Sequence, residues 1–474
     1  MTSQAPRTIQ VMETIRSRIS TRALLPGERL PSIRRLAASM GLSPSTVVEA
    51  YERLAAEGLI RSRPGAGFYV AGAGPSLEMR DPASARDRAV DPFWVSRQTL
   101  DAPDTALRPG CGWLPPDWMP EAALRRALRQ VARGDAGVLT DYGSSQGLTD
   151  LRRLLARQFA DEGLAVGPDD ILLTGSTSQA HDLICRYLLR PGDTVLLDDP
   201  CYFNFQALLR VYKLRIISVP MTPFGPDLAA FAEALRDHAP RLYITNSALH
   251  NPTGATMSAQ IAHRLLTLAT SHDLTIVEDE TFAALEPDPS PRLAALDGLE
   301  RVIRVGGFSK TLSASIRCGY IAGPTALIDT LTDLQVATSF GGPGPLAAEV
   351  VHAALSDGSY RKHVAALRQR LSRKQREVAR KLAAMGIEPW LMPRGGFYLW
   401  CRLPEGRDAG QIARRTLHDN LVLAPGNVFS PAQTAAGLMR FNIAQMPDRA
   451  FDILAQILSE SVAEPGAQPS ASSP

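Results

Sequence analysis

The stretch GGFSKTLSASIRCGY, residues 306–320, contains Lys310 and Arg317 seven residues apart in a run of small and hydroxyl side chains. Lysine is rare in this chain, since only five of its 51 basic residues are lysines. Arginine therefore supplies ordinary positive charge, and a lysine within a small polar motif indicates amine chemistry that a guanidinium cannot perform. The motif follows the apolar run 302–305, so we expect it in a loop at the end of a strand.

Short apolar runs that precede this loop predict the fold class of the long C-terminal part. They lie at 171–174, 194–198, 241–245, 275–278 and 302–305. Helical patterns separate them, and one such helix carries Ala180, Leu183, Ile184, Tyr187 and Leu188. Strands that alternate with helices predict an α/β fold with a buried parallel sheet. Open parallel sheets bind ligands at the ends of their strands.

Further polar motifs stand at these predicted strand ends. LLTGSTSQAH (172–181) reads as strand, turn and helix, and we expect Gly175, Ser176 and Thr177 to present N–H groups and hydroxyls to a phosphate. HNPTG (250–254) places Asn251 on a turn, and VEDE (277–280) places Asp279 at the end of a strand. Each motif alone is typical of ordinary turns.

Together, and in this order, the motifs resemble the class I and II aminotransferases of pyridoxal-phosphate fold type I, over about residues 108–458. The resemblance implies pyridoxal 5'-phosphate as cofactor, with Lys310 as its Schiff-base lysine and Asp279 at the pyridine nitrogen. It also implies that Asn251 donates to the ring O3′, and that Arg317, Ser176 and Thr177 hold the phosphate.

The same resemblance assigns three residues outside these motifs. Tyr202 in DPCYF matches the aromatic residue that stacks on the ring, and Arg440 in LMRFNIA matches the arginine that binds a substrate carboxylate. Tyr142 in DYGSSQG matches a tyrosine contributed by the neighbouring subunit, which implies a homodimer. From the residues alone, both tyrosines could be ordinary core aromatics. The histidines, His181 and His250 among them, lack ligand-like spacing, and we expect no metal site.

Two departures from the family pattern concern catalysis. Thr281 and Phe282 occupy the positions where these enzymes usually carry a tyrosine that bonds to O3′, and Gly307 replaces a phosphate-binding serine. The loss of a hydroxyl removes one group that tunes the pKa of the bound cofactor. We therefore expect cofactor binding with, at most, low transaminase activity.

The N-terminal 71 residues differ in charge from the rest of the chain. They contain ten arginines, no lysine and five glutamates, a net charge of +5, which leaves −2 for the remainder. A basic end of this kind indicates nucleic-acid binding. Helical patterns at 8–22, 32–40 and 44–57, followed by short strands at 59–62 and 67–70, predict a winged helix-turn-helix of α+β class.

Residues 30–70, LPSIRRLAASMGLSPSTVVEAYERLAAEGLIRSRPGAGFYV, resemble the GntR-type winged helix of bacterial regulators. The resemblance implies DNA contacts by Arg34, by Ser43, Ser45 and Thr46 at the start of the recognition helix, and by Gly65 in the wing. Arg35 and Arg63 can also neutralise phosphates. Pro44 departs from the family pattern, and the recognition helix carries Glu49 and Glu52. The alternative is a winged helix that binds protein and carries its arginines on a solvated face.

The complete layout is a winged helix at 1–71, a linker at 72–108, an aminotransferase-like domain at 109–461 and a disordered tail at 462–474. It resembles the MocR subfamily of GntR-type regulators. This implies a regulator that binds a double-stranded DNA operator as a domain-swapped homodimer and senses an amino acid, an amine or pyridoxal phosphate. The alternatives are a working aminotransferase with an incidental winged helix, and a structural DNA-bridging protein that has lost its cofactor.

Composition and sequence pattern indicate the cellular compartment of the protein. Of the 474 residues 45% are hydrophobic and 21% charged, which is usual for globular domains. We find no apolar run of membrane-spanning length and no secretory signal in MTSQAPRTIQ, and the five cysteines are scattered. These features predict a cytoplasmic protein without disulfides or membrane contact.

Overall fold

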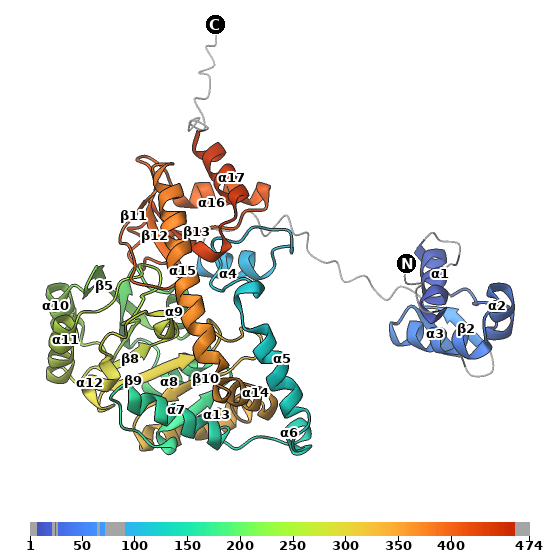
Figure 1. Cartoon of the computed structure of the whole chain (residues 1–474), viewed down its shortest axis with the longest axis horizontal. Coiled ribbons are helices and arrows are strands. Elements are labelled where there is room, and N and C mark those ends of the chain that lie inside the picture. Colours follow the sequence, from blue (N-terminus) through green and yellow to red (C-terminus); the bar gives the residue numbers. More distant parts are fainter. Residues whose placement is uncertain (1–6, 21–23, 25–26, 64–66, 72–90, 460–474) are drawn as a thin grey trace, which may run out of the picture. The chain divides into compact units, whose positions relative to one another are not determined.

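The computed structural model describes residues 7–459, apart from 21–23, 25–26, 64–66 and 72–90 (Figure 1). Gly65, most of the predicted linker and the predicted tail at 462–474 therefore lie outside the described residues. The chain divides into two compact units, residues 1–87 and 88–474. Among the described helices, none is long and apolar enough to cross a membrane.

The N-terminal unit has the elements of a winged helix-turn-helix. They are α1 (Arg7–Ser20), α2 (Ile33–Met40), α3 (Pro44–Ala56), β1 (Ile60–Arg63) and β2 (Gly67–Val70). β1 and β2 are antiparallel, with Ile60 opposite Val70. Val47, Ala50, Tyr51 and Leu54 form the buried face of α3, as its spacing predicts. Ser43 caps α3, since its side chain accepts from the N–H of Thr46 at 3.3 Å.

The larger unit is built on a sheet that, within the described part of the chain, has eight strands. Their order is β3 (Ile171–Thr174), β10 (Gly319–Ala322), β9 (Val302–Gly307), β8 (Thr275–Asp279), β7 (Leu242–Thr245), β4 (Thr194–Asp199), β5 (Arg215–Thr222) and β6 (Gly225–Pro226). The pairs β5–β4, β4–β7, β7–β8 and β8–β9 are parallel. β10, however, is antiparallel to both β3 and β9, so the sheet is mixed, and the predicted parallel arrangement is found in the five strands β5, β4, β7, β8 and β9.

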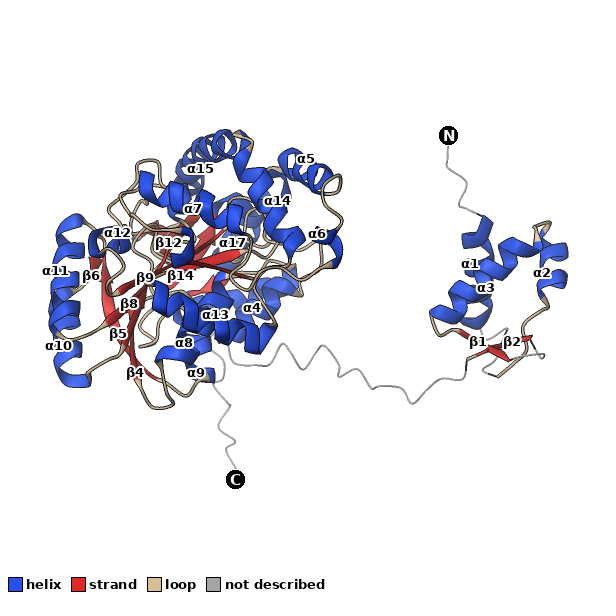
Figure 2. Cartoon of the chain, turned by 90° about the horizontal axis from the view of Figure 1, so that it is seen from below, coloured by secondary structure: helices blue, strands red, loops and turns tan. Residues whose placement is uncertain are grey.

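Helices cover both faces of this sheet (Figure 2). One face packs on α7 (Thr149–Asp161), α10 (Leu228–His238), α11 (Ala259–Ser271), α12 (Leu293–Asp297) and α14 (Pro345–Ser356). The other packs on α8 (Thr177–Leu188), α9 (Phe203–Val211) and α13 (Thr325–Ser339). Side chains alternate between the two cores, as in β4, where Leu196 faces the first and Leu197 the second. Two more helices, α5 (Glu121–Val131) and α6 (Gly137–Thr140), precede α7.

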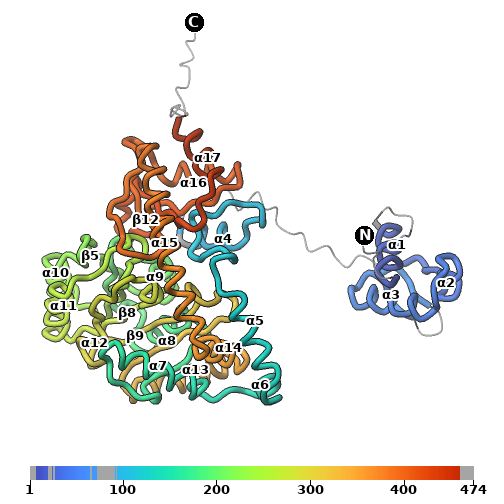
Figure 3. The backbone as a smooth tube through the Cα atoms, viewed as in Figure 1, coloured from blue at the N-terminus to red at the C-terminus, as the bar shows by residue number. Residues whose placement is uncertain are grey.

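A smaller layer follows the long helix α15 (Ser359–Ala383), which leads from the sheet to it (Figure 3). Its antiparallel sheet has the order β11 (Glu388–Pro389), β12 (Tyr398–Arg402), β14 (Leu438–Asn442) and β13 (Ala424–Pro425). The helices α16 (Ala409–Thr416) and α17 (Asp448–Ser459) pack with α15 around a third core.

Residues 91–108, predicted as linker, belong to the larger unit. Asp91 caps the helix α4 (Pro92–Leu100) through the N–H of Trp94. Trp94 and Val95 are buried with Phe203, Trp400 and other apolar side chains. Beyond α4, the backbone of Leu107 bonds to those of Asn420 and Val422. The linker prediction is therefore wrong for 91–108. Two buried apolar side chains, Trp94 and Val95, are enough to fix this short helix on the core of the larger unit.

Candidate functional site

Lys310 lies just after β9, where the sequence places it. Its Nζ donates to the carbonyl of Gly112 at 2.7 Å and lies 5.8 Å from the centre of the Phe282 ring. Burial, together with the positive charges of Arg440 and Arg317, lowers the pKa of Lys310 to about 8. A larger share of this amine is therefore neutral near pH 7 than of an ordinary lysine, and the neutral form is the nucleophile.

Asp279 ends β8 and is buried beside His181 of α8. The Nε2 of His181 lies 2.8 Å from Oδ2 of Asp279, and the N–H of Thr281 donates to Oδ1 at 2.9 Å. Burial by itself would raise the pKa of Asp279, but the bonds from His181 and Thr281 hold it below its ordinary value. The carboxylate therefore stays charged in the interior. Sequence reasoning gave His181 no role, and the signal that could have found it was its place one turn into the helix that follows the GST turn.

The N-terminus of α8 and the Arg317 loop lie close together. A Cβ at Gly319 would stand 2.9 Å from the backbone N of Thr177, so glycine there permits the close approach of β10. Ser176 caps α8 by accepting from Gln179 at 3.0 Å. The N–H of Gly175, predicted to face a phosphate, instead donates to the side chain of Gln179 at 2.6 Å. The free N–H groups of the first turn of α8 remain a site for an anion.

Arg317 has an unusual backbone and a free side chain. Its φ is +53°, a left-handed conformation that costs energy in a residue other than glycine and is frequent at functional sites. Among the described residues its guanidinium has no hydrogen bond or ion pair. The side chain is exposed and therefore free to pair with an incoming anion.

Arg440 on β14 is almost completely buried, with 1% of its surface exposed. Nη1 donates to Oδ1 of Asn251 at 2.8 Å, and Nη2 donates to the carbonyl of Gly110 at 2.7 Å. The guanidinium carbon lies 4.2 Å from the ring centre of Tyr398, while Nε has no partner among the described residues. The structure thus joins Asn251 and Arg440, which are 189 residues apart in the chain.

The two predicted tyrosines differ in their surroundings. Tyr202 is half-buried at the start of α9, and its hydroxyl accepts from Asn204 at 2.8 Å. Tyr142 is 82% exposed and packs edge-on against Phe340, itself 68% exposed, with 4.9 Å between ring centres. An ordinary core role is excluded for Tyr142, and a contact with a second subunit stays a prediction.

Both departures from the family pattern are packed tightly. Phe282 is buried against the rings of Phe397 and Tyr398, at 5.6 and 5.4 Å between centres. A Cβ at Gly307 would stand 3.1 Å from the methyl carbon of Thr177, so that methyl group fills the space a serine would need. Both positions therefore lie in tight packing, and neither side chain carries a hydroxyl.

These residues fit a phosphate ester that bears an aldehyde and a basic ring nitrogen. Lys310 supplies a partly neutral amine, Asp279 a charged carboxylate in a buried setting, and the start of α8 with Arg317 an anion site. Arg440 adds a second, separate place for a carboxylate. The set suits a cofactor that stabilises negative charge on an amino compound.

The predicted DNA contacts lie on the surface of the N-terminal unit. Arg34, Arg35 and Arg63 are exposed, and Arg63 stacks over Tyr69 at 4.6 Å. The hydroxyl of Ser43 bonds to those of Ser45 and Thr46 at 2.9 and 2.8 Å, which clusters three hydroxyls at the start of α3. Arg53 pairs with Glu49 at 2.6 Å and offsets part of the acidic charge on this helix.

Comparison with known proteins agrees with this division. The model of class I and II aminotransferases matches residues 114–458, well over half of the chain. The chain belongs to this family. The model of bacterial regulatory proteins of the gntR family matches residues 8–70, so the chain is a GntR-type helix-turn-helix fused to an aminotransferase-like domain, as predicted.

Relatives that cover nearly the whole chain carry the name of HTH-type transcriptional regulators, whereas the structures of similar fold include aminotransferases. The HTH-type transcriptional regulator YdcR of Escherichia coli (strain K12) is 31% identical over 447 residues, which are 92% of this chain and 94% of YdcR. YisV of Bacillus subtilis (strain 168), also an HTH-type transcriptional regulator, is 26% identical and covers 94% of each chain. LysN, the α-aminoadipate aminotransferase of Thermus thermophilus, complexed with N-(5'-phosphopyridoxyl)-L-leucine, superposes with a TM-score of 0.71 at 25% identity. That superposition covers 81% of this chain and 98% of LysN. This GntR-type regulator therefore joins DNA binding to an aminotransferase fold.

Proposed function

We propose that the aminotransferase-like domain of this regulator binds pyridoxal 5'-phosphate and uses it to sense a carboxylated amino compound. The observation that carries the proposal is the environment of Lys310: a largely buried amine whose pKa is lowered to about 8, with Arg440 and Arg317 among the causes. A lysine kept only for charge or for solubility would be exposed and fully protonated at neutral pH.

The chain's own groups divide the work of holding the cofactor. The start of α8 and Arg317 bind the phosphate, and Tyr202 covers one face of the ring. Asp279, oriented by His181, pairs with the ring nitrogen and keeps it protonated. When bound, pyridoxal phosphate supplies an aldehyde that reacts reversibly with primary amines and a ring that withdraws electrons. Lys310 would be the residue that holds the cofactor through this aldehyde.

Arg440 then selects amines that carry a carboxylate. Its guanidinium is held flat by Asn251, Gly110 and the ring of Tyr398, and its Nε is left without a partner among the described residues. A planar, preorganised guanidinium binds a carboxylate through two parallel hydrogen bonds. Because Arg440 lies in the smaller layer and Lys310 in the larger, one ligand that engages both would draw the two layers together.

A working aminotransferase is the less favoured alternative. Phe282 and Gly307 lack the hydroxyls that these enzymes use, and apolar packing fills both places. The full-length relatives are regulators. We further propose that the protein acts as a cytoplasmic, domain-swapped homodimer of the MocR type, in which Tyr142 reaches the phosphate of the partner subunit. Its 82% exposure supports that role.

The test is fluorescence anisotropy of the full chain on labelled DNA from upstream of its own gene. The titration is run without cofactor, with pyridoxal phosphate, and with pyridoxal phosphate plus a panel of amino acids and amines. We expect DNA affinity to change with at least one amino compound, and only when cofactor is present. Rapid turnover of amino acids without any change in DNA affinity would establish the enzyme alternative instead.

A further inference from the structure

A second hollow lies on the face of the sheet opposite the cofactor residues. Its volume is about 980 Å3, and α7, α12, β9 and α15 contribute to its walls. Asp279 and Glu280 are neighbours in sequence, so their side chains leave the end of β8 in opposite directions. Asp279 turns to His181 of α8, and Glu280 turns to Arg304 on the α7 side.

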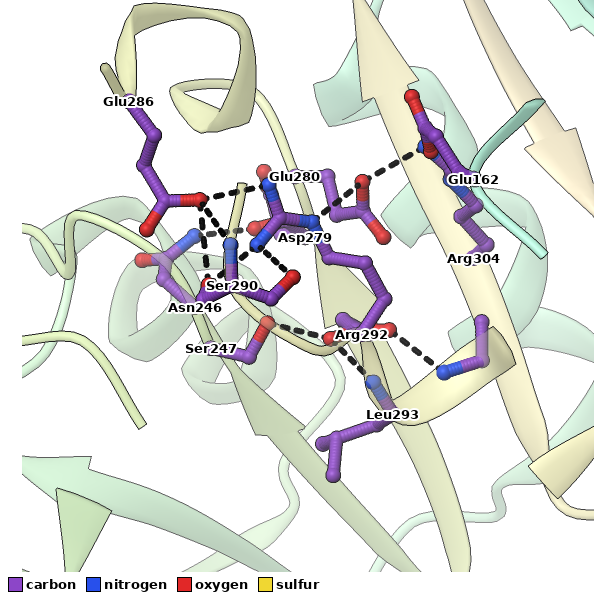
Figure 4. Close-up of polar contacts among 12 residues, drawn as sticks. Glu162, Asn246, Ser247, Asp279, Glu280, Glu286, Ser290, Arg292, Leu293 and Arg304 are labelled. Atoms are coloured by element: carbon purple, nitrogen blue, oxygen red, sulfur yellow. Dashed lines mark hydrogen bonds and ion pairs between the residues drawn. The ribbon is translucent and has the colours of Figure 1, made fainter. Parts of the chain in front are cut away.

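The floor of the hollow is a chain of alternating charges (Figure 4). Glu162 bonds to Arg304 at 2.6 Å, and Arg304 bonds to Glu280 at 2.7 Å. Glu280 lies 3.5 Å from Arg292, which bonds to Glu286 at 2.7 Å. Of these residues, Glu162, Glu280, Arg292 and Arg304 line the hollow, so its floor carries charges of both signs.

Three atoms of this chain of charges have no hydrogen-bond partner among the described residues: Oε1 of Glu280, and Nε and Nη1 of Arg304. Oε1 of Glu280 makes no hydrogen bond within the described part of the protein, although the side chain is 1% exposed. A buried carboxylate oxygen without a donor is costly, and such groups usually have a partner. Burial and the nearby carboxylates of Glu278 and Glu162 raise the pKa of Glu280 to about 8, against the opposing effect of Arg304 and Arg292. Near pH 7 this carboxyl is therefore mostly protonated, and a cationic donor beside Oε1 would favour its ionised form.

The rim of the hollow carries two arginines of α15. Arg361 and Arg368 of α15 both line the hollow, and their spacing of seven residues places them on one face of the helix, about 10 Å apart along it. Arg361 is exposed and has no hydrogen bond or ion pair among the described residues. Arg368 uses only Nε, which donates to the carbonyl of Ala284 at 2.9 Å. The free nitrogens of both guanidiniums can take a carboxylate.

We propose that this hollow is a second binding site, for a small zwitterion whose cationic nitrogen pairs with Glu280 and whose carboxylate pairs with Arg361 and Arg368. The lining holds both acidic side chains and arginines, so a zwitterion finds a partner for each of its two charges; they are Asp161, Glu162, Glu280, Arg292, Arg304, Arg361 and Arg368. The site uses neither Lys310 nor Arg440, so it does not depend on cofactor binding or on the sensing proposed above.

The probe is 4-guanidinobutyrate, which carries both charges but no primary amine and therefore does not react with an aldehyde. We expect isothermal titration of the full chain to give saturable binding at one site per chain. Glu280→Gln and, separately, the double change Arg361→Gln with Arg368→Gln should each weaken this binding at least about tenfold. Lys310→Ala should leave it within about twofold of the unmodified chain.

The double variant Arg361→Gln with Arg368→Gln keeps the test decisive if Glu280→Gln disturbs folding of the buried network. Arg361 is exposed and Arg368 is half-buried, so their replacement should leave the fold intact. The matched control of this rim variant is Arg376→Gln with Arg380→Gln, two exposed arginines of α15 outside the lining, which removes the same charge. The proposal is overturned if the probe shows no saturable binding, if the control weakens binding as much as the rim variant, or if only Lys310→Ala abolishes it.

Discussion

At the scale of single residues, Lys310 shows how a local environment prepares a side chain for chemistry. Burial and the two guanidiniums of Arg440 and Arg317 all disfavour its charged form, and its pKa falls to about 8. As the pH rises toward this pKa, the fraction of Lys310 in the neutral form increases about tenfold per pH unit, and above the pKa it levels off. We predict that the rate of pyridoxal phosphate attachment follows the same curve, measured by absorbance after rapid mixing. Lys310→Arg should show no attachment, and Lys362→Ala, a change at an exposed lysine, should behave as the unmodified chain.

His181 offers a second prediction at this scale. His181→Leu removes the hydrogen bond that offsets the effect of burial on Asp279, so the pKa of Asp279 should rise. A smaller fraction of this carboxyl is then charged, and its ion pair with the ring nitrogen of the cofactor should weaken. We expect affinity for pyridoxal phosphate, followed by quenching of protein fluorescence, to fall at least about tenfold. His181→Gln retains a donor and should keep most of the affinity. Equal losses in both variants would show that the ring of His181, not its hydrogen bond, matters.

Residues of this site were predictable from sequence where each stands beside a strand. Lys310 and Asp279 follow apolar runs directly, so their strand-end positions could be read from the chain. The hydrogen-bond partners of the site residues could not be predicted in this way. His181 is 98 residues from Asp279, and Asn251 is 189 from Arg440, and no local pattern encodes such pairs. The filled space at Gly307 depends on the methyl group of Thr177, which only the folded chain brings near.

At the scale of elements, the sequence pattern missed two short elements for one physical reason. β10 (Gly319–Ala322) begins at the end of the motif 306–320, where the small residues that serve the site hid the start of a four-residue strand. α4 lies in a stretch whose composition favours a linker, yet Trp94 and Val95 complete an apolar cluster formed by α9 and the smaller layer. Short elements gain most of their stability from tertiary packing, so their local pattern is weak.

The position of α4 predicts where the larger unit can be cut. A chain of residues 88–474 keeps Trp94, whereas 105–474 loses it and opens the cluster around Phe203, Trp400 and Phe429. Loss of a buried tryptophan costs about 3–5 kcal/mol. We expect the shorter chain to unfold at clearly lower urea concentration, measured by circular dichroism. Trp94→Ala in 88–474 should reproduce most of that loss, while Leu100→Ala, at an exposed position, should have little effect.

The same helix contacts two residues of the proposed effector site, directly or through one neighbour. Ser96 donates to Asn204 at 3.4 Å, and Asn204 donates to the hydroxyl of Tyr202, the residue expected to cover the cofactor ring. Phe429 packs in the cluster of Trp94 and also lies 4.7 Å from the guanidinium of Arg440. We therefore expect a ligand that moves Tyr202 or Arg440 to shift α4 as well.

At the scale of the whole molecule, DNA binding should reside in the N-terminal unit. Arg34 and Arg35 are exposed on α2, and removal of one phosphate-binding side chain should reduce the slope of log affinity against log salt by about one unit. We predict this reduction for Arg34→Ala and for Arg35→Ala in anisotropy titrations over a range of salt. Arg236→Ala, an exposed charge on α10, is the matched control and should leave the slope unchanged. Tight DNA binding by residues 88–474 alone would contradict this division.

The last prediction concerns coupling between the two functions. If an amine shifts DNA affinity by some factor, DNA must shift the affinity for that amine by the same factor, which for coupled sites is typically about 5–150-fold. The pair 5-aminovalerate and pentylamine differs only in a carboxylate, so we expect a response to the first alone. Arg440→Lys keeps the charge but loses the planar fork that Asn251 and Gly110 orient, and it should abolish that response while cofactor binding and basal DNA binding persist. The two factors are measured by titrating DNA with and without saturating amine, and amine with and without saturating DNA. Unequal factors would mean that the titrations had not reached equilibrium, because the equality holds for any coupling mechanism. An equal response to pentylamine would remove Arg440 from the sensing role.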